Sequence, residues 1–129
     1  MKYSSIILID DDHIIRYSFK KLIKEFFPSQ TFSIFEHGGQ GLDYLNNLDF
    51  EKYDKKILIL LDINMPQIDG WSFLKKFKEQ PLTFKKNITI HILSSTIDRN
   101  EIKTILENTL ISGHISKPLT LDELRKLIE

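Results

Sequence analysis

The chain has 129 residues, which is enough for one three-layer domain and too few for a separate effector domain beside it. Lys plus Arg and Asp plus Glu balance at 18 each, so the net charge does not favour nucleic acid or an anionic membrane as a partner. The chain has no Cys, which excludes disulfides and thiolate metal sites, and no apolar stretch is long enough for a signal peptide or a membrane span. We therefore expect one cytoplasmic domain over residues 1–129.

Apolar runs that are typical of buried strands alternate with segments of helical periodicity. Strands are expected at residues 4–10, 31–35, 57–61, 88–93 and, as a short last strand, 114–116. The segments between and after them carry apolar residues at helical spacing, which should face the core: Ile15, Phe19, Leu22, Ile23 and Phe26; Leu42 and Leu45; Phe73, Leu74 and Phe77; Ile102, Ile105 and Leu106; Leu121, Leu124, Leu127 and Ile128. This order predicts an α/β fold, a (βα)5 flavodoxin-like, doubly wound sheet of five parallel strands in the order 2-1-3-4-5.

Turn and cap residues separate these segments. Pro28 ends the first helix, and the loops are expected at residues 49–56, around Pro66 and Asp69-Gly70, and at residues 81–87. The last two helices begin with spacings that resemble helix caps, namely Asp98 with Glu101 and Thr120 with Glu123.

An acidic cluster, Asp10-Asp11-Asp12, follows the first strand directly. One aspartate at this place could simply cap the next helix, whose N-terminus favours negative charge. Three aspartates in a row repel one another, however, and one cap uses only one of them. A hard cation would relieve the repulsion, and a site with only oxygen ligands suits Mg²⁺ or Mn²⁺ better than zinc.

Polar side chains that could handle a phosphoryl group follow three other strands. Asp62 ends the third strand, which lies beside the first in the predicted order, so Asp62 should lie near Asp10 and Asp11. A carboxylate can attack phosphorus to form an acyl phosphate, provided that the incoming charge is neutralised. Ser94-Ser95 and Lys117 follow the fourth and fifth strands, where a hydroxyl and an amine could hold phosphoryl oxygens. Each residue alone is as typical of a cap, a turn or a surface lysine, but their shared place after strands favours one site.

Together these residues resemble the receiver domain of response regulators in two-component signalling, over essentially the whole chain. The motifs are Asp10-Asp11, then Asp62-Ile63-Asn64-Met65-Pro66 with Asp69-Gly70, then Ser94-Ser95 and Lys117-Pro118. The resemblance implies that Asp62 is the phospho-acceptor. It implies that Asp11 binds Mg²⁺ directly, Asp10 largely through water, and Asn64 through its backbone carbonyl. It further implies that Lys117 holds the phosphoryl oxygens, that Ser94 is the switch hydroxyl, that small Ser95 leaves access to the site, and that the Lys117-Pro118 bond is cis.

The chain departs from this family at the switch position of the fifth strand. Tyr or Phe is most often found there, and this chain has His114. A His side chain can still move between buried and exposed rotamers, and its charge can respond to pH. The resemblance therefore implies a switch of Ser94 and His114, with an imidazole in place of a phenol or phenyl ring.

The implied function is that of a single-domain response regulator, which catalyses only its own aspartate phosphorylation and dephosphorylation. Its partners would be a histidine kinase or a histidine phosphotransfer protein, and an unknown output protein. Its output would be either binding of that protein to the surface of the fourth helix, fifth strand and fifth helix, or onward transfer of the phosphoryl group. Two other hypotheses remain open. A receiver-fold adaptor would never be phosphorylated. A phosphatase of the haloacid-dehalogenase type would need a second Asp two residues after Asp62, where this chain has Asn64.

Overall fold

Strands and helices alternate along the chain in the computed structural model, which describes residues 2–48, 56–65, 69–80 and 85–129. The strands are β1 (Ser5–Ile9), β2 (Phe32–Phe35), β3 (Ile57–Asp62), β4 (Ile88–Ser94) and β5 (Ile111–Ser116). The helices are α1 (His13–Phe26), α2 (Gly38–Asn46), α3 (Gly70–Glu79), α4 (Arg99–Glu107) and α5 (Leu121–Ile128), with a 3-10 turn, η1 (Lys85–Asn87), before β4. Residues 49–55, Pro66 and residues 81–84, which we expected in loops, lie outside the described residues.

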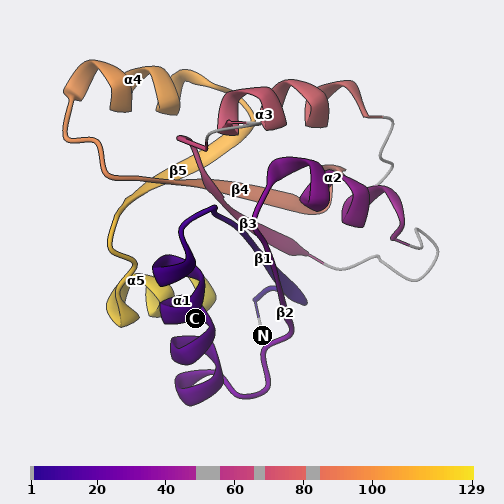
Figure 1. The fold of residues 1–129 in the computed structure, drawn as a ribbon, viewed down its shortest axis with the longest axis vertical. Helices are drawn as coiled ribbons and strands as arrows, with labels where there is room; N and C mark the ends of the chain where they lie inside the picture. The colour runs from indigo at the N-terminus through magenta and orange to yellow at the C-terminus, as the bar shows by residue number, and fades with distance from the viewer. Residues whose placement is uncertain (1, 49–55, 66–68, 81–84) are drawn as a thin grey trace.

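The five strands form one parallel sheet in the order β2-β1-β3-β4-β5 (Figure 1). The predicted fold class and strand order are therefore confirmed. β1 and β3 lie in the middle of the sheet and are buried along their whole length, which explains their nearly continuous apolar sequences. The register pairs Leu61 of β3 with Ile9 of β1 and with Ile92 of β4. The carboxyl ends of these three strands consequently lie at one edge of the sheet.

Two layers of helices cover the sheet. α1 and α5 pack on one face, and α2, α3 and α4 pack on the other (Figure 1). Successive side chains of a strand point to opposite faces of the sheet, so the residues of β1 contribute to the two cores alternately. Ile6 and Leu8 join the core under α1 and α5, whereas Ile7 and Ile9 join the core under α2, α3 and α4. This packing uses both faces of the sheet and leaves its carboxyl edge to the loops.

Short polar side chains begin four of the helices. Asp12, Asp69, Asp98 and Thr120 each accept a hydrogen bond from a backbone N–H in the first turn of α1, α3, α4 and α5, respectively. These bonds satisfy donors that a helix start leaves without an intrahelical partner. The predicted caps at Asp98 and Thr120 are confirmed.

Two apolar side chains that we expected in the core are substantially exposed. Phe26 is 42% exposed and Leu106 is 52% exposed. Both lie in the last turn of a helix. The Phe26 ring instead lies near Arg125 of α5, with the guanidinium carbon 6.0 Å from the ring centroid. The prediction that these two residues face the core was wrong.

The last strand is longer than its sequence suggested. β5 begins at Ile111, three residues before the expected start at residue 114. Gly113 hid this part of the strand, because glycine is depleted in strand interiors. A Cβ at this position would lie 2.6 Å from Nδ1 of His91 on the neighbouring strand, so any larger residue would require the His91 ring to shift.

Candidate functional site

Three carboxylates meet at the carboxyl edge of the sheet. Asp10 follows β1 and Asp62 ends β3, with only 0% and 2% of their surface exposed, and Asp11 is half-buried. One carboxylate oxygen of each residue lies within 4.8 Å of the other two. The pairing of Ile9 with Leu61 causes this meeting, because it sets the residues that follow these two, Asp10 and Asp62, side by side. The prediction that Asp62 lies near Asp10 and Asp11 is confirmed.

The three aspartates in the turn from β1 into α1 have different surroundings. Oδ1 of Asp10 accepts a hydrogen bond from the backbone N–H of Asp12 at 2.9 Å. Oδ1 of Asp12 accepts from the N–H of Ile14 at 2.8 Å and so caps α1. Nη1 of Arg16 donates to the backbone carbonyl of Asp10 at 2.9 Å, which ties the first turn of α1 to the end of β1. One aspartate of the three is thus a helix cap, and the other two are left for the site.

Lys117 supplies the cation of this site from the end of β5. Its Nζ atom lies 3.0 Å from Oδ2 of Asp10 and 3.3 Å from Oδ1 of Asp62. Its backbone N–H donates to the carbonyl of Ser94 at 2.9 Å, and the Lys117-Pro118 peptide bond is cis, as the resemblance implied. Burial lowers the pKa of Lys117, but the hydrogen bonds and charges of Asp10 and Asp62 outweigh burial and raise its pKa above the ordinary value. The amine is therefore charged and fixed between two carboxylates.

The surroundings raise the pKa of Asp62 from 3.8 to about 6. Burial is the largest cause and the negative charge of Asp10 is the second. The backbone N–H of Asn64, which donates to Oδ1 of Asp62 at 3.1 Å, and the charge of Lys117 both act against this rise. The positive charge of Lys117 therefore does not fully compensate for the burial and the negative charge of the carboxylates. Ionised Asp62 is consequently less favourable in the folded protein than in water.

The donor set fits a hard divalent cation. Oδ2 of Asp10 is buried and accepts no hydrogen bond of good geometry from the described residues, although it lies at ion-pair distance from Lys117. The carboxylate oxygens that surround it are the ligands that Mg²⁺ and Mn²⁺ prefer. A cation in contact with Asp10, Asp11 and Asp62 would pair this oxygen and offset both the burial of Asp62 and the negative charge of Asp10, the two causes that raise the pKa of Asp62.

Ser94 ends β4 beside this pocket and is buried. Its Oγ accepts a hydrogen bond from the backbone N–H of Thr96 at 2.9 Å, and Nε2 of His114 lies 3.3 Å from the same oxygen. Asp62 pairs with Leu93 in the sheet, so Ser94 lies one residue beyond the level of Asp62. Ser95 is exposed. The structure thus brings together the predicted pair Ser94 and His114.

Two residues of this region were not found by sequence analysis. Arg16 anchors the Asp10 carbonyl, and its guanidinium also lies 3.6 Å from the Glu36 carboxylate. Thr96 holds Ser94 through its N–H and donates its own hydroxyl to Glu101 at 2.8 Å. The six-residue spacing from Asp10 to Arg16 was the only available signal, and an arginine in an amphipathic helix is too common for that spacing to be informative.

Comparisons with known proteins agree with this geometry. The model of the family described as "Response regulator receiver domain" matches residues 6–129. The chain belongs to this receiver-domain family. It is 27% identical over 129 residues to sporulation initiation phosphotransferase F of Bacillus subtilis, over 100% of this chain and 94% of that protein. Another relative, the nitrate/nitrite response regulator protein NarL of Escherichia coli, is 28% identical, and the match covers 97% of this chain but 53% of that protein.

Solved receiver structures resemble this receiver domain along its whole length. A response regulator receiver protein from Dyadobacter fermentans has 26% identity and a TM-score of 0.83, over 96% of this chain and 94% of that one. A two-component response regulator from Cytophaga hutchinsonii has 28% identity and a TM-score of 0.82, over 99% and 96% of the two chains. The receiver domain is a signalling module rather than a classical enzyme, with an acidic pocket of Asp10, Asp11 and Asp62. None of the helices in the described ranges is long and apolar enough to cross a bilayer.

Proposed function

We propose that this receiver domain accepts a phosphoryl group onto Asp62 from the phosphohistidine of a histidine kinase or a histidine phosphotransfer protein. The observation that supports this most strongly is the position of Lys117, whose amine lies within 3.3 Å of both Asp10 and Asp62 in a pocket of three carboxylates. A buried nucleophile, a fixed cation and an oxygen-only metal site are the groups that transfer of a phosphoryl group to a carboxylate requires.

Asp62 is the nucleophile in this proposal. One of its carboxylate oxygens forms a bond to phosphorus while the bond from phosphorus to the donor imidazole nitrogen breaks, and the electron pair of that bond stays on the nitrogen. The product is an acyl phosphate. The raised pKa of Asp62, about 6, still leaves the carboxylate mostly ionised at neutral pH.

The other residues of the pocket neutralise and orient the phosphoryl group. Mg²⁺, or Mn²⁺ in its place, would be held by Asp10, Asp11, Asp62 and the backbone carbonyl of Asn64, and it supplies positive charge to the transferred oxygens. Lys117 keeps a second positive charge beside Asp62 through its contacts with the two buried carboxylates. Exposed Ser95 leaves the approach to Asp62 open to a donor protein.

Ser94 and His114 link the phosphoryl group to the protein surface in this proposal. In the unphosphorylated protein the Ser94 hydroxyl oxygen contacts the Thr96 N–H and the His114 ring. A phosphoryl oxygen on Asp62 offers this hydroxyl a stronger, charged acceptor, and its movement would free both contacts. The loop before α4 and the α4-β5-α5 surface would then shift, which changes what an output protein can bind.

Phosphorylation is tested by the intact mass of the protein after incubation with acetyl phosphate and Mg²⁺. We expect one added phosphoryl group in the wild type, and none in Asp62→Asn or in wild type with EDTA. If acetyl phosphate adds no mass, a purified histidine phosphotransfer protein is the second donor to try. No transfer from either donor would overturn the proposal and would support the receiver-fold adaptor instead.

A further inference from the structure

The loop between β4 and α4, residues 95–98, has only one residue that is not exposed. Ser95, Ile97 and Asp98 are exposed, and Ile97 is 92% exposed, so apolar burial contributes little to the position of the loop. Thr96 is half-buried. The polar contacts of Thr96 are therefore the main contacts that can hold this loop in place.

Two hydrogen bonds join the Thr96 hydroxyl to the start of α4. Its Oγ1 accepts from the backbone N–H of Asp98 at 3.1 Å and donates to Oε2 of Glu101 at 2.8 Å. Glu101 offers a carboxylate acceptor, and bonds to a carboxylate are stronger than bonds between neutral groups. Glu101 belongs to the first turn of α4, where its N–H donates to Oδ1 of Asp98 at 3.4 Å. The loop is thus fastened to a helix through one side chain.

The backbone of Thr96 carries this restraint on to Ser94. The N–H of Thr96 donates to Oγ of Ser94 at 2.9 Å, and Nε2 of His114 lies 3.3 Å from the same oxygen. A chain of hydrogen bonds therefore runs from Glu101 through Thr96 to the Ser94 hydroxyl. A movement of this hydroxyl away from its place must break the bond to the Thr96 N–H or pull Thr96 away from Glu101.

We propose that Thr96 and Glu101 are positioning residues, which hold the Ser94 hydroxyl in its unphosphorylated place and so oppose phosphorylation of Asp62. This inference rests on the proposed function, in which Ser94 moves to a phosphoryl oxygen. A contact that exists only before the movement stabilises the unphosphorylated state, and its loss shifts the equilibrium toward the phosphorylated conformation. Neither residue belongs to the cluster of carboxylates, so their loss should leave the affinity for Mg²⁺ unchanged.

The equilibrium is measured with Mg²⁺ and beryllofluoride, BeF₃⁻, which mimics a phosphoryl group on a carboxylate and transfers nothing. Thr96→Val removes the hydroxyl and keeps the shape of the side chain, and it should bind beryllofluoride about three- to tenfold more tightly than the wild type. Thr96→Ser keeps the hydroxyl and should bind as the wild type does. Equal or weaker binding by Thr96→Val would overturn this inference alone. No binding by any form, the wild type included, would overturn the proposed function and this inference with it.

A double variant assigns the effect to the bond between the two side chains. Glu101→Ala should also tighten the binding of beryllofluoride, and adding it to Thr96→Val should give little further gain, because one bond can be lost only once. Gains that multiply would overturn the role of this bond. Thr104→Val is the matched control on α4, since its hydroxyl donates to the Asn100 carbonyl at 2.9 Å within the helix, and it should bind as the wild type does.

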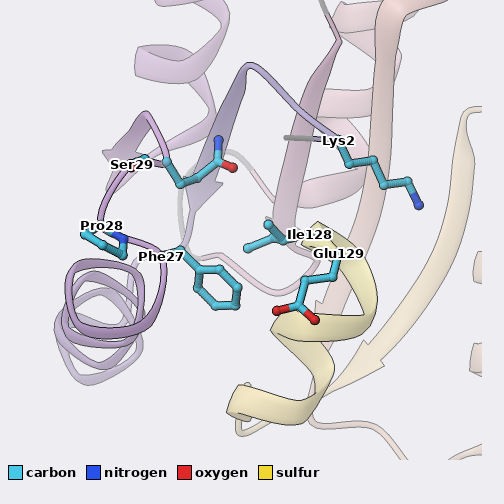
Figure 2. Close-up of a pocket in the computed structure, with 7 residues that line it drawn as sticks. Lys2, Phe27, Pro28, Ser29, Ile128 and Glu129 are labelled. Carbon is cyan, nitrogen blue, oxygen red and sulfur yellow. The ribbon is translucent and has the colours of Figure 1, made fainter.

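A variant at the other edge of the sheet controls for a general loss of stability. A cavity of about 470 Å³ lies between the ends of α1 and α5, and Phe27 lines it (Figure 2). Phe27 precedes β2, whose first residue pairs with Ile6 near the start of β1, so it lies far from the carboxyl ends of the strands. Phe27→Ala should lower the free energy of unfolding and leave the affinity for beryllofluoride unchanged. Tighter binding by Phe27→Ala as well would overturn the inference.

Discussion

The Nζ atom of Lys117 lies 3.3 Å from Oδ1 of Asp62, although their strands are not neighbours in the sheet. Lys117 follows β5 and Asp62 ends β3, so the lysine side chain reaches across the end of β4. Its backbone N–H, which is bonded to the Ser94 carbonyl, fixes the point from which it reaches. Lys117 thus links the carboxyl ends of four adjacent strands, β1 and β3 through its side chain and β4 through its backbone N–H, at the edge where the carboxylates meet.

Lys117→Gln should destabilise the protein at pH 7.5 by about 2–4 kcal/mol, because it leaves two buried carboxylates without their cation. The loss should be smaller at pH 5, where Asp62 takes up a proton more readily. Urea unfolding at the two pH values measures both effects. Lys103→Gln is the matched control, since its 3.9 Å pair with Glu107 is exposed and should contribute less than about 1 kcal/mol. Equal losses in the two variants would contradict this account of Lys117.

Asp62→Asn should stabilise the protein without Mg²⁺, and increasingly so as the pH rises from about 4 to about 6. The wild type binds the Asp62 proton more tightly when folded, with a pKa of about 6, than when unfolded, with a pKa of 3.8. Its free energy of unfolding therefore falls as pH rises through this window, whereas the neutral amide has no such loss. The gain at pH 7.5 should be about 2–3 kcal/mol relative to pH 4. Urea unfolding across this range would contradict the account if the difference between the two proteins did not change with pH.

Mg²⁺ should stabilise the folded protein, because the unfolded chain has no cluster of carboxylates to bind it. At 10 to 100 times the dissociation constant the gain is about 1.4–2.7 kcal/mol. The gain should be smaller at pH 5, since a proton on Asp62 competes with the cation. Thermal unfolding with MgCl₂, against KCl of equal ionic strength, measures the effect, and Asp11→Asn should reduce it. No difference between the two salts at pH 7.5 would count against the metal site.

Arg16→Met should weaken Mg²⁺ binding several-fold without unfolding the protein. The arginine holds the backbone carbonyl of Asp10 at 2.9 Å, so its loss frees the turn that carries Asp10 and Asp11. Isothermal titration with Mg²⁺ gives the affinity. Glu36→Gln is the control, because it removes the 3.6 Å contact of Arg16 with Glu36 and keeps the bond to Asp10. If Glu36→Gln weakens Mg²⁺ binding as much as Arg16→Met does, the hydrogen bond from Arg16 to the Asp10 carbonyl is not the contact that supports Mg²⁺ binding.

The fold and the acidic pocket could be predicted because their signals are local in the sequence. Continuous apolar runs mark the buried strands, and the residue after each run is necessarily at the carboxyl edge of a parallel sheet. That rule was enough to place Asp10, Asp62, Ser94 and Lys117 at one edge. The cis Lys117-Pro118 bond came only from the family resemblance, because a Lys-Pro pair by itself does not specify the isomer.

The features that sequence analysis missed depend on contacts between segments that are distant in sequence. Gly113 was left out of the predicted fifth strand because nothing in its own segment shows that His91 of β4 occupies the space of its Cβ. Phe26 looked like a core residue because its spacing continues the apolar face of α1, yet it is 42% exposed and lies near Arg125 of α5, a contact between distant segments. The bond from Arg16 to the Asp10 carbonyl and the pKa of Asp62 follow from the packed geometry, which no local pattern encodes.

Reductive trapping identifies the residue that carries the phosphoryl group, which we propose to be Asp62. Borohydride reduces an acyl phosphate on aspartate to homoserine, and peptide mass spectrometry then identifies the residue that was modified. We predict homoserine at position 62 after incubation with a phosphoryl donor and Mg²⁺, and no homoserine there when EDTA is present. Homoserine at position 10, 11 or 12 instead, or phosphate that is stable to borohydride on a serine or histidine, would contradict it.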